Sequence, residues 1–212
     1  MATFDAAWHD LALPAQRCLE LAHVALLAGG LAVGAVVVDG SNLIVAEGRN
    51  RAYDPPTGTD HLEATPLAHA EMNAMARLST ATPLGSFTMW STQQPCSMCS
   101  AAATFIGVGQ IEAIAADPSN PADYAITTAA SLWVVLATTM FMVGRIRRRG
   151  NEDPAIAANK ALEPEAVGLA LRVLRHDRHP LLSGQSLDTA LDAVWEHLRA
   201  AADHRDSRLQ HR

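Results

Sequence analysis

The alternation of apolar and polar positions divides the first part of the chain into short elements. From residue 10 to 28, apolar side chains recur at helical spacing, and Gly29-Gly30 predicts where that helix ends. Residues 32–38 form a short β-branched apolar run that ends in Asp39-Gly40, a strong hairpin turn, and residues 43–46 are expected to be the return strand. The sequence therefore predicts a helix followed by a β-hairpin.

Strands and helices alternate in the next part of the chain. Thr65-Pro66 has the order of a capping residue and a proline that is typical of a first helical turn. Residues 86–91 have strand composition and run into a second helix headed by Pro95, and residues 110–115 are expected to be another buried strand. This order predicts an α/β fold, a three-layer α/β/α sandwich with a central mixed sheet, in which the second helix joins a parallel pair of strands.

The apolar segment over residues 124–144 has two interpretations. About 20 apolar residues with flanking arginines are typical of a transmembrane helix. Several threonines make the segment only borderline apolar, so we favour a strand over 132–137 followed by a buried helix over 139–147. The arginines at 145–149 are then expected to end that helix and to complement its dipole.

The chain is expected to form one domain over residues 1–150 and a C-terminal helical extension over 151–212 that packs on the same domain. Helical patterns run over 164–174 and 186–198, whereas the charged end at 203–212 is expected to be frayed.

Candidate metal ligands stand at the starts of two predicted helices, in His69-Ala70-Glu71 and in Pro95-Cys96-Ser97-Met98-Cys99. Catalytic zinc takes three protein ligands and leaves a fourth position for water. One imidazole and two thiolates provide such a set, and the spacing of Cys96 and Cys99 puts both sulfurs on one face of a helix. Glu71 is then free to move protons.

Other interpretations of these residues are a structural zinc site or a redox pair of cysteines. A structural site would usually show a fourth ligand at close spacing, and Cys18 lies far away in the sequence. His61 would be a fourth ligand only in that alternative, and we expect His61 and Glu63 to be solvated loop residues or part of the pocket's outer rim. Cys18 and His23 are expected to be packing residues.

Composition narrows the class of protein. The 212 residues are 49% hydrophobic and 18% charged, which suits a domain with a sizeable core. A net charge of −6 argues against a broad nucleic-acid-binding surface. Three cysteines, of which two are assigned to metal, argue against a disulfide framework. With Asp5 and Asp10 where a secretory signal would be basic, we expect a cytoplasmic protein.

His-x-Glu followed by Pro-Cys-x-x-Cys is the known signature of zinc-dependent deaminases. Over residues 10–118 the sequence resembles the cytidine and deoxycytidylate deaminase superfamily, in the branch of guanine deaminases and tRNA adenosine deaminases. Gly48-Arg49-Asn50 adds to that resemblance. The branch usually has Glu before Pro-Cys, whereas this chain has Gln94, preceded by Gln93. The resemblance implies a sheet between helices and a homodimer. It also implies the following site: zinc held by His69, Cys96 and Cys99, Glu71 as the proton shuttle, and the Asn50 side chain and the Ala70 backbone in contact with the base.

The expected function is hydrolytic deamination of a small heterocycle, such as guanine or a related aminopurine or aminotriazine such as ammeline. Asp117 is a candidate acceptor for a ring N–H and equally a turn residue before Pro118. The first alternative is a tRNA-specific adenosine deaminase that grips phosphate with the arginines at 145–149. The second is a non-catalytic protein that zinc stabilises or a membrane anchors. The acidic charge disfavours nucleic acid as a partner.

Overall fold

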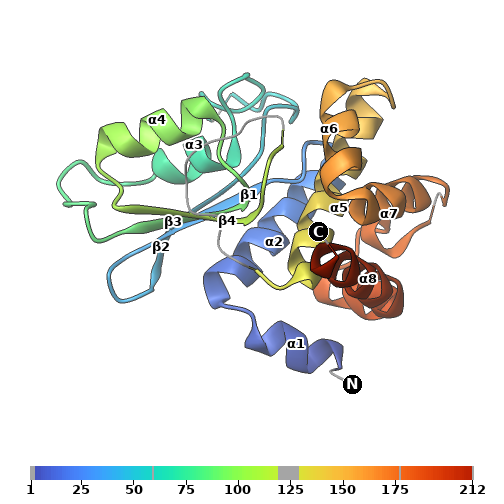
Figure 1. Ribbon diagram of the computed structural model, residues 1–212. Helices are drawn as coiled ribbons and strands as arrows, with labels where there is room; N and C mark the ends of the chain where they lie inside the picture. Colours follow the sequence, from blue (N-terminus) through green and yellow to red (C-terminus); the bar gives the residue numbers. More distant parts are fainter. Residues whose placement is uncertain (1–2, 59, 119–128, 177, 212) are drawn as a thin grey trace.

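A mixed four-stranded sheet forms the centre of the molecule, with helices on both faces (Figure 1). The computed structural model describes residues 3–58, 60–118, 129–176 and 178–211. The strand order is β2-β1-β3-β4, where the strands are β1 (Gly34–Val38), β2 (Ile44–Arg49), β3 (Thr88–Gln93) and β4 (Gln110–Ala115). The strand β1 is antiparallel to β2 and β3, whereas β3 and β4 are parallel. The expected fold class, hairpin and parallel pair are confirmed.

Helices cover the sheet from opposite sides (Figure 1). On one face lies α2 (Leu13–Leu27), preceded by the short α1 (Phe4–Asp10), which no sequence pattern indicated. The other face carries α3 (Ala70–Met75) and α4 (Ser97–Ile106). Gly48 lets α3 approach β2 closely, because a Cβ atom there would lie 2.4 Å from the Ala70 carbonyl oxygen.

The expected helix start at Thr65-Pro66 is wrong. The helix begins only at Ala70, and residues 65–67 form turns. The Thr65 hydroxyl donates a hydrogen bond back to the Leu62 carbonyl, so it stabilises the loop. A Thr-Pro pair is compatible with turns as well as with helix starts, and the local contact decides between them.

The segment expected to contain a strand and a helix is one helix, α5 (Ser131–Arg149). The strand prediction over 132–137 is wrong because α5 is buried almost all round, between α2 and β4 on one side and α7 and α8 on the other. A helix buried on every side has no polar face to mark its period. Residues 124–128 of that segment lie outside the described residues. In the described part of the chain no helix has the length and apolarity needed to cross a bilayer.

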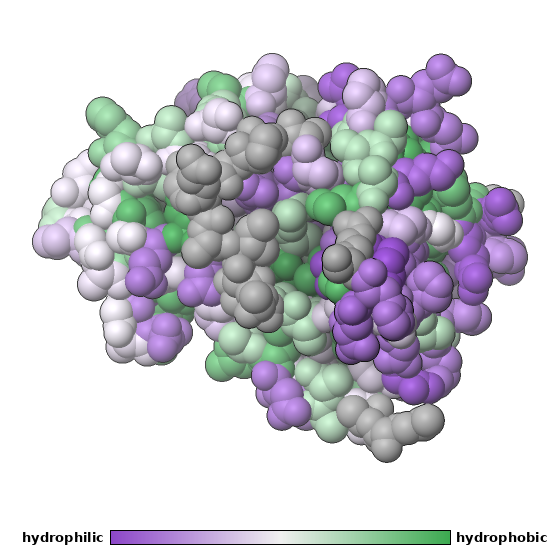
Figure 2. All heavy atoms as spheres, in the orientation of Figure 1, coloured by the Kyte–Doolittle hydropathy of each residue, from purple (hydrophilic) through white to green (hydrophobic). Residues whose placement is uncertain are grey.

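The C-terminal helices cover α5 on the side away from the sheet (Figure 1). They are α6 (Pro154–Leu162), α7 (Pro164–Leu174) and α8 (Leu187–Gln210), with a 3-10 turn at Pro180–Leu182. Hydrophilic side chains gather over this part of the surface (Figure 2). The bounds of α7 and α8 confirm the helices predicted over 164–174 and 186–198.

The frayed end predicted over 203–212 is wrong, because α8 continues to Gln210. Arg205 forms two hydrogen bonds to the Glu163 carboxylate, at 2.6 and 2.7 Å. Arg208 does the same to Glu165, with both distances at 2.8 Å. These pairs hold the last turns of α8 on the start of α7.

Candidate active site

His69 and Cys96 occupy equivalent positions, since they are the N-cap residues of α3 and α4. Neither side chain caps its own helix, so the imidazole and the thiol are available for another partner. Cys99 lies in the first turn of α4. The sheet brings the two helix starts together, because α4 follows β3 and α3 packs on the neighbouring hairpin.

The three donor atoms lie at the corners of a small triangle. Cys96 Sγ lies 3.5 Å from His69 Nδ1, Cys99 Sγ lies 3.6 Å from that nitrogen, and the two sulfurs are 3.6 Å apart. With zinc–sulfur bonds of about 2.3 Å and zinc–nitrogen bonds of about 2.0 Å, a tetrahedral site has edges of roughly 3.8 Å between sulfurs and roughly 3.5 Å between sulfur and nitrogen. Among the described residues, His69, Cys96 and Cys99 form the only group of three or more His, Cys, Asp or Glu side chains that could hold a metal ion. The donor set fits zinc.

The side chains of the triangle shift one another's proton affinity. Hydrogen bonds with Cys99 and His69 lower the pKa of the Cys96 thiol to about 3. The hydrogen bond with Cys96, together with burial, raises the pKa of Cys99. The hydrogen bond with Cys96 also raises the pKa of His69. The first of these shifts favours a thiolate, the form in which cysteine binds metals.

Glu71 lies beside this triangle, in the first turn of α3. Its side chain is buried, and burial raises the pKa of its carboxyl group. The Ser91 hydroxyl donates a hydrogen bond to Oε1, and Cys99 Sγ lies 3.5 Å from Oε2. A carboxyl group held in this way is suited to proton transfer, because a raised pKa lies nearer to neutral pH.

His69, Cys96 and Glu71 line a cavity of about 360 Å³, whereas Cys99 is fully buried and is not part of the lining. The cavity walls come from the segment before β1, from the loops after β2, β3 and β4, and from the C-terminal half of α5. The lining residues are Leu31, Val33, Asn50, Ala52, Tyr53, Pro66, His69, Glu71, Gln93, Gln94, Cys96, Asp117, Phe141, Arg145 and Arg149. This volume lies within the range of small-molecule sites.

The structure places the other predicted site residues differently. Asn50 lines the cavity and is buried, and its Oδ1 accepts a hydrogen bond from the Ala52 amide. Asp117 also lines the cavity, and its backbone amide donates a hydrogen bond to Gln94 Oε1 at 3.2 Å. Ala70 is fully buried at the first position of α3 and is not among the lining residues. Their roles toward a substrate stay predictions.

Three of the arginines near the end of α5 have different surroundings. Arg145 and Arg149 line the cavity, and Arg145 donates a hydrogen bond to Asp153 at 2.6 Å. Arg148 stacks on the Tyr53 ring, 4.2 Å from its centroid, and donates to the Gly29 carbonyl. Arg145 and Arg149 were not assigned to the cavity by the sequence analysis. The signal that could have indicated them is their spacing, four residues apart on one helix.

Gln93 is the second group that sequence reasoning did not assign to the cavity. It is the last residue of β3, and its side chain is buried. A polar residue where a parallel strand ends is the signal that could have indicated it, since ligands bind at such ends.

His61 and Glu63 lie outside the cavity lining. His61 is exposed, as expected. The expectation that Glu63 is solvated is wrong, because its carboxylate is buried, pairs with Arg51 and accepts a hydrogen bond from the Thr57 amide. Cys18 and His23 are buried packing residues, as expected.

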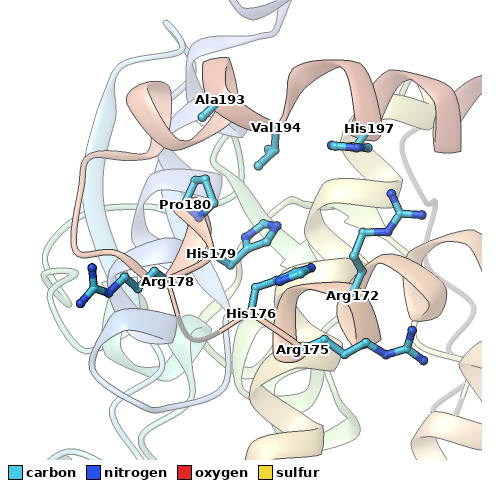
Figure 3. Close-up of a pocket in the computed structure, with 9 residues that line it drawn as sticks. All are labelled: Arg172, Arg175, His176, Arg178, His179, Pro180, Ala193, Val194 and His197. Carbon is cyan, nitrogen blue, oxygen red and sulfur yellow. The ribbon is translucent and has the colours of Figure 1, made fainter.

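A larger cavity, of about 900 Å³, lies between α7, the 3-10 turn and α8, and contains none of the motif residues (Figure 3). Arginines and histidines dominate its lining, which is Arg172, Arg175, His176, Arg178, His179, Pro180, Ala193, Val194 and His197. Figure 3 shows the side chains of Arg175 and Arg178 pointing away from its centre. Size alone therefore does not locate the candidate chemistry, which belongs to the smaller cavity.

Among solved structures, several deaminases resemble this chain modestly. A structure from work on A-to-I editing by tRNA:A34 deaminases is 25% identical, with 52% of this chain and 81% of that chain covered and a TM-score of 0.43. The guanine deaminase from Bacillus subtilis is 27% identical, with 49% and 63% covered and a TM-score of 0.41. The guanine deaminase from Nitrosomonas europaea is 23% identical, with 71% and 85% covered and a TM-score of 0.42.

The sequence also matches one family profile. No curated protein matches the sequence significantly. Residues 11–114 match the profile described as the cytidine and deoxycytidylate deaminase zinc-binding region. This range contains His69, Glu71 and both cysteines of the triangle. Over that range, just under half of its length, the chain carries the zinc-binding region of the cytidine and deoxycytidylate deaminase family.

Proposed function

We propose that this protein is a zinc-dependent hydrolytic deaminase that converts the amino group of a small nitrogen heterocycle to an oxo group and releases ammonia. Guanine, a related aminopurine or an aminotriazine such as ammeline is the first candidate substrate. The observation that supports this proposal is the triangle of donors at tetrahedral spacing beside a buried carboxyl group, open to a cavity of about 360 Å³.

In this proposal His69, Cys96 and Cys99 hold the metal. Bound there, zinc would act as a Lewis acid that lowers the pKa of a water molecule. Glu71 takes a proton from the attacking water and delivers it to the ring nitrogen next to the reacting carbon. A second proton passes through Glu71 to the amino group, which leaves as ammonia. Water and the amino compound thus give the oxo compound and ammonia, without any oxidant or reductant.

The cavity walls provide the proposed substrate contacts. Asn50 has its carboxamide oriented by the bond from the Ala52 amide, so its NH₂ group is available as a donor to the base. Asp117 is proposed to accept a ring N–H, and the Ala70 backbone to contact the ring or its exocyclic group. The division into a domain over 1–150 and an extension over 151–212, the homodimer and the cytoplasmic location remain predictions.

A tRNA-specific adenosine deaminase is the second candidate. Arg145 and Arg149 favour it, because both line the cavity and could contact phosphate. The pairing of Arg145 with Asp153 and the contact of Arg148 with Tyr53 leave fewer arginines for that role. Binding of tRNA that weakens steeply with salt would support this candidate.

The test is ammonia release by the zinc-loaded protein from free bases, nucleosides, nucleotides, aminotriazines and tRNA. We expect turnover of at least one free base and at least a thousandfold loss of kcat in the variant Glu71→Gln, with zinc content unchanged. A zinc-loaded protein that is folded but releases no ammonia from any compound would support the non-catalytic alternative. Retention of most turnover by Glu71→Gln would contradict the assigned proton shuttle.

A further inference from the structure

The Gln93 side chain is a buried polar group with an unmet hydrogen-bonding need. Its relative exposure is 4%, and its Nε2 atom has no hydrogen-bond partner among the described residues. Buried polar groups are nearly always paired, and leaving one unpaired costs stability. The same side chain lines the cavity that Glu71 and Asn50 also line.

The neighbouring glutamine makes a useful contrast. Gln94 accepts a hydrogen bond from the Asp117 backbone amide and so helps to fix the turn after β4. Gln93 has no comparable structural bond, although its backbone is held in register opposite Ala115. The position of Gln93 therefore contributes an unpaired donor to the cavity and no side-chain bond to the fold.

We propose that Gln93 determines substrate specificity by pairing with a lactam edge, a ring N–H next to a ring carbonyl, on the heterocycle. This inference rests on the proposed function of the same cavity. A primary carboxamide offers a donor and an acceptor side by side, so it matches the acceptor and donor of a lactam with two hydrogen bonds. Guanine and cytosine have such an edge, whereas adenosine has no ring carbonyl. The pairing therefore favours oxo-substituted amino heterocycles over adenosine.

The carboxamide of Gln93 favours a neutral partner over a charged one. A carboxylate at this position would favour an edge with two donors and would add a second buried acid near Glu71. The carboxamide instead recognises a neutral edge without adding charge to the buried wall. Recognition by a hydrogen bond in a buried site discriminates strongly, because an analogue that lacks the matching atoms leaves the protein group unpaired.

The experiment compares Gln93→Leu with the wild-type zinc-loaded protein on two matched pairs of compounds. The pairs are guanine with 2-aminopurine and cytosine with 4-aminopyrimidine, which share the reacting amino group and differ in the lactam. We expect Gln93→Leu to lower kcat/KM about tenfold for the lactam compound that the wild type deaminates, and less than twofold for its analogue. The matched control is Gln110→Leu, the same change at an exposed position at the start of β4.

A readout without turnover separates this inference from the proposed function. Calorimetric binding of guanine and cytosine to zinc-loaded Glu71→Gln should weaken about tenfold when Gln93→Leu is added. If this weakening is seen but the wild-type protein releases no ammonia, the proposed function is overturned and the inference about recognition by Gln93 stands. Equal losses on both members of a pair, unchanged kinetics and binding, or no binding of either compound would overturn the inference. The melting temperature of Gln93→Leu should not fall, because the substitution removes an unpaired buried amide.

Discussion

The Ser91 hydroxyl donates a hydrogen bond to Glu71 Oε1 across 3.1 Å, and both side chains are buried. This bond links the carboxyl group on α3 to the central strand β3. One carboxylate oxygen is thereby held, while the other faces Cys99 at 3.5 Å. The bond fixes the direction of Glu71 relative to the donor triangle.

Replacing Ser91 by Ala should slow catalysis without removing the metal. The variant loses one neutral donor to the carboxylate, so we expect kcat to fall about tenfold with KM and zinc content unchanged. The control is Thr92→Val on the next residue, whose hydroxyl accepts a hydrogen bond from the Gly34 amide. That control should lower stability and leave kcat within about twofold. A larger effect on KM than on kcat in Ser91→Ala would contradict a positioning role.

Metal binding should depend on one cysteine and not on another. Cys96→Ser removes a thiolate from the triangle, and we expect bound zinc to fall well below one ion per chain. Cys18→Ala is the control, because Cys18 is buried, is not part of the triangle, and burial raises the pKa of its thiol. Zinc content after dialysis, measured by atomic spectroscopy, checks both variants. Loss of zinc from Cys18→Ala with the fold intact would contradict the assignment.

The pairing of Glu165 with Arg208 should make the C-terminal helix sensitive to acid. Burial raises the pKa of Glu165, but the hydrogen bonds and charge of Arg208, together with hydrogen bonds from the backbone and from His204, outweigh it and lower that pKa from 4.5 to about 2. A lowered folded-state pKa contributes stability above the unfolded value, which is lost as the pH falls from 4.5 toward 2. We expect a coupling free energy of about 2 kcal/mol at pH 7 from a double-mutant cycle with Glu165→Gln and Arg208→Met, decreasing over that range.

Urea unfolding at several pH values measures this coupling. The control cycle is Arg199 with Glu196, an exposed pair on α8 whose coupling free energy should lie below about 0.5 kcal/mol at every pH. A Glu165–Arg208 coupling that stays constant down to pH 2 would show that the pair contributes through packing and not through charge.

The sequence indicated the donor triangle because its residues are chemically specific and because each stands beside a helix start. The strand at 110–115 and the hairpin were equally clear, since alternation and a turn bounded them. The helix α5 was not, because a helix enclosed by other elements has lost the polar face that reveals its period. The tail after residue 203 was misjudged because charged residues there pair with Glu163 and Glu165, which lie about forty positions earlier.

The role of Gln93 could not be predicted from its neighbours in sequence. What distinguishes it is an unpaired amide inside a cavity, and this depends on Asn50, Glu71 and α5, which distant parts of the chain bring together. The same holds for Glu63, a loop residue whose burial depends on Arg51. Long-range polar contacts of this kind leave no periodic signal in the sequence.

The close approach at Gly48 has a consequence for redesigning this scaffold. Even a methyl group there would lie 2.4 Å from the Ala70 carbonyl oxygen and 2.5 Å from the Ala74 amide nitrogen, so α3 would have to move away from β2. His69 and Glu71 would move with it, although neither residue had been changed. Variant libraries made to find new substrates should therefore change the cavity wall and keep glycine at position 48. The positions of His69 and Glu71 depend on the absence of a Cβ atom there.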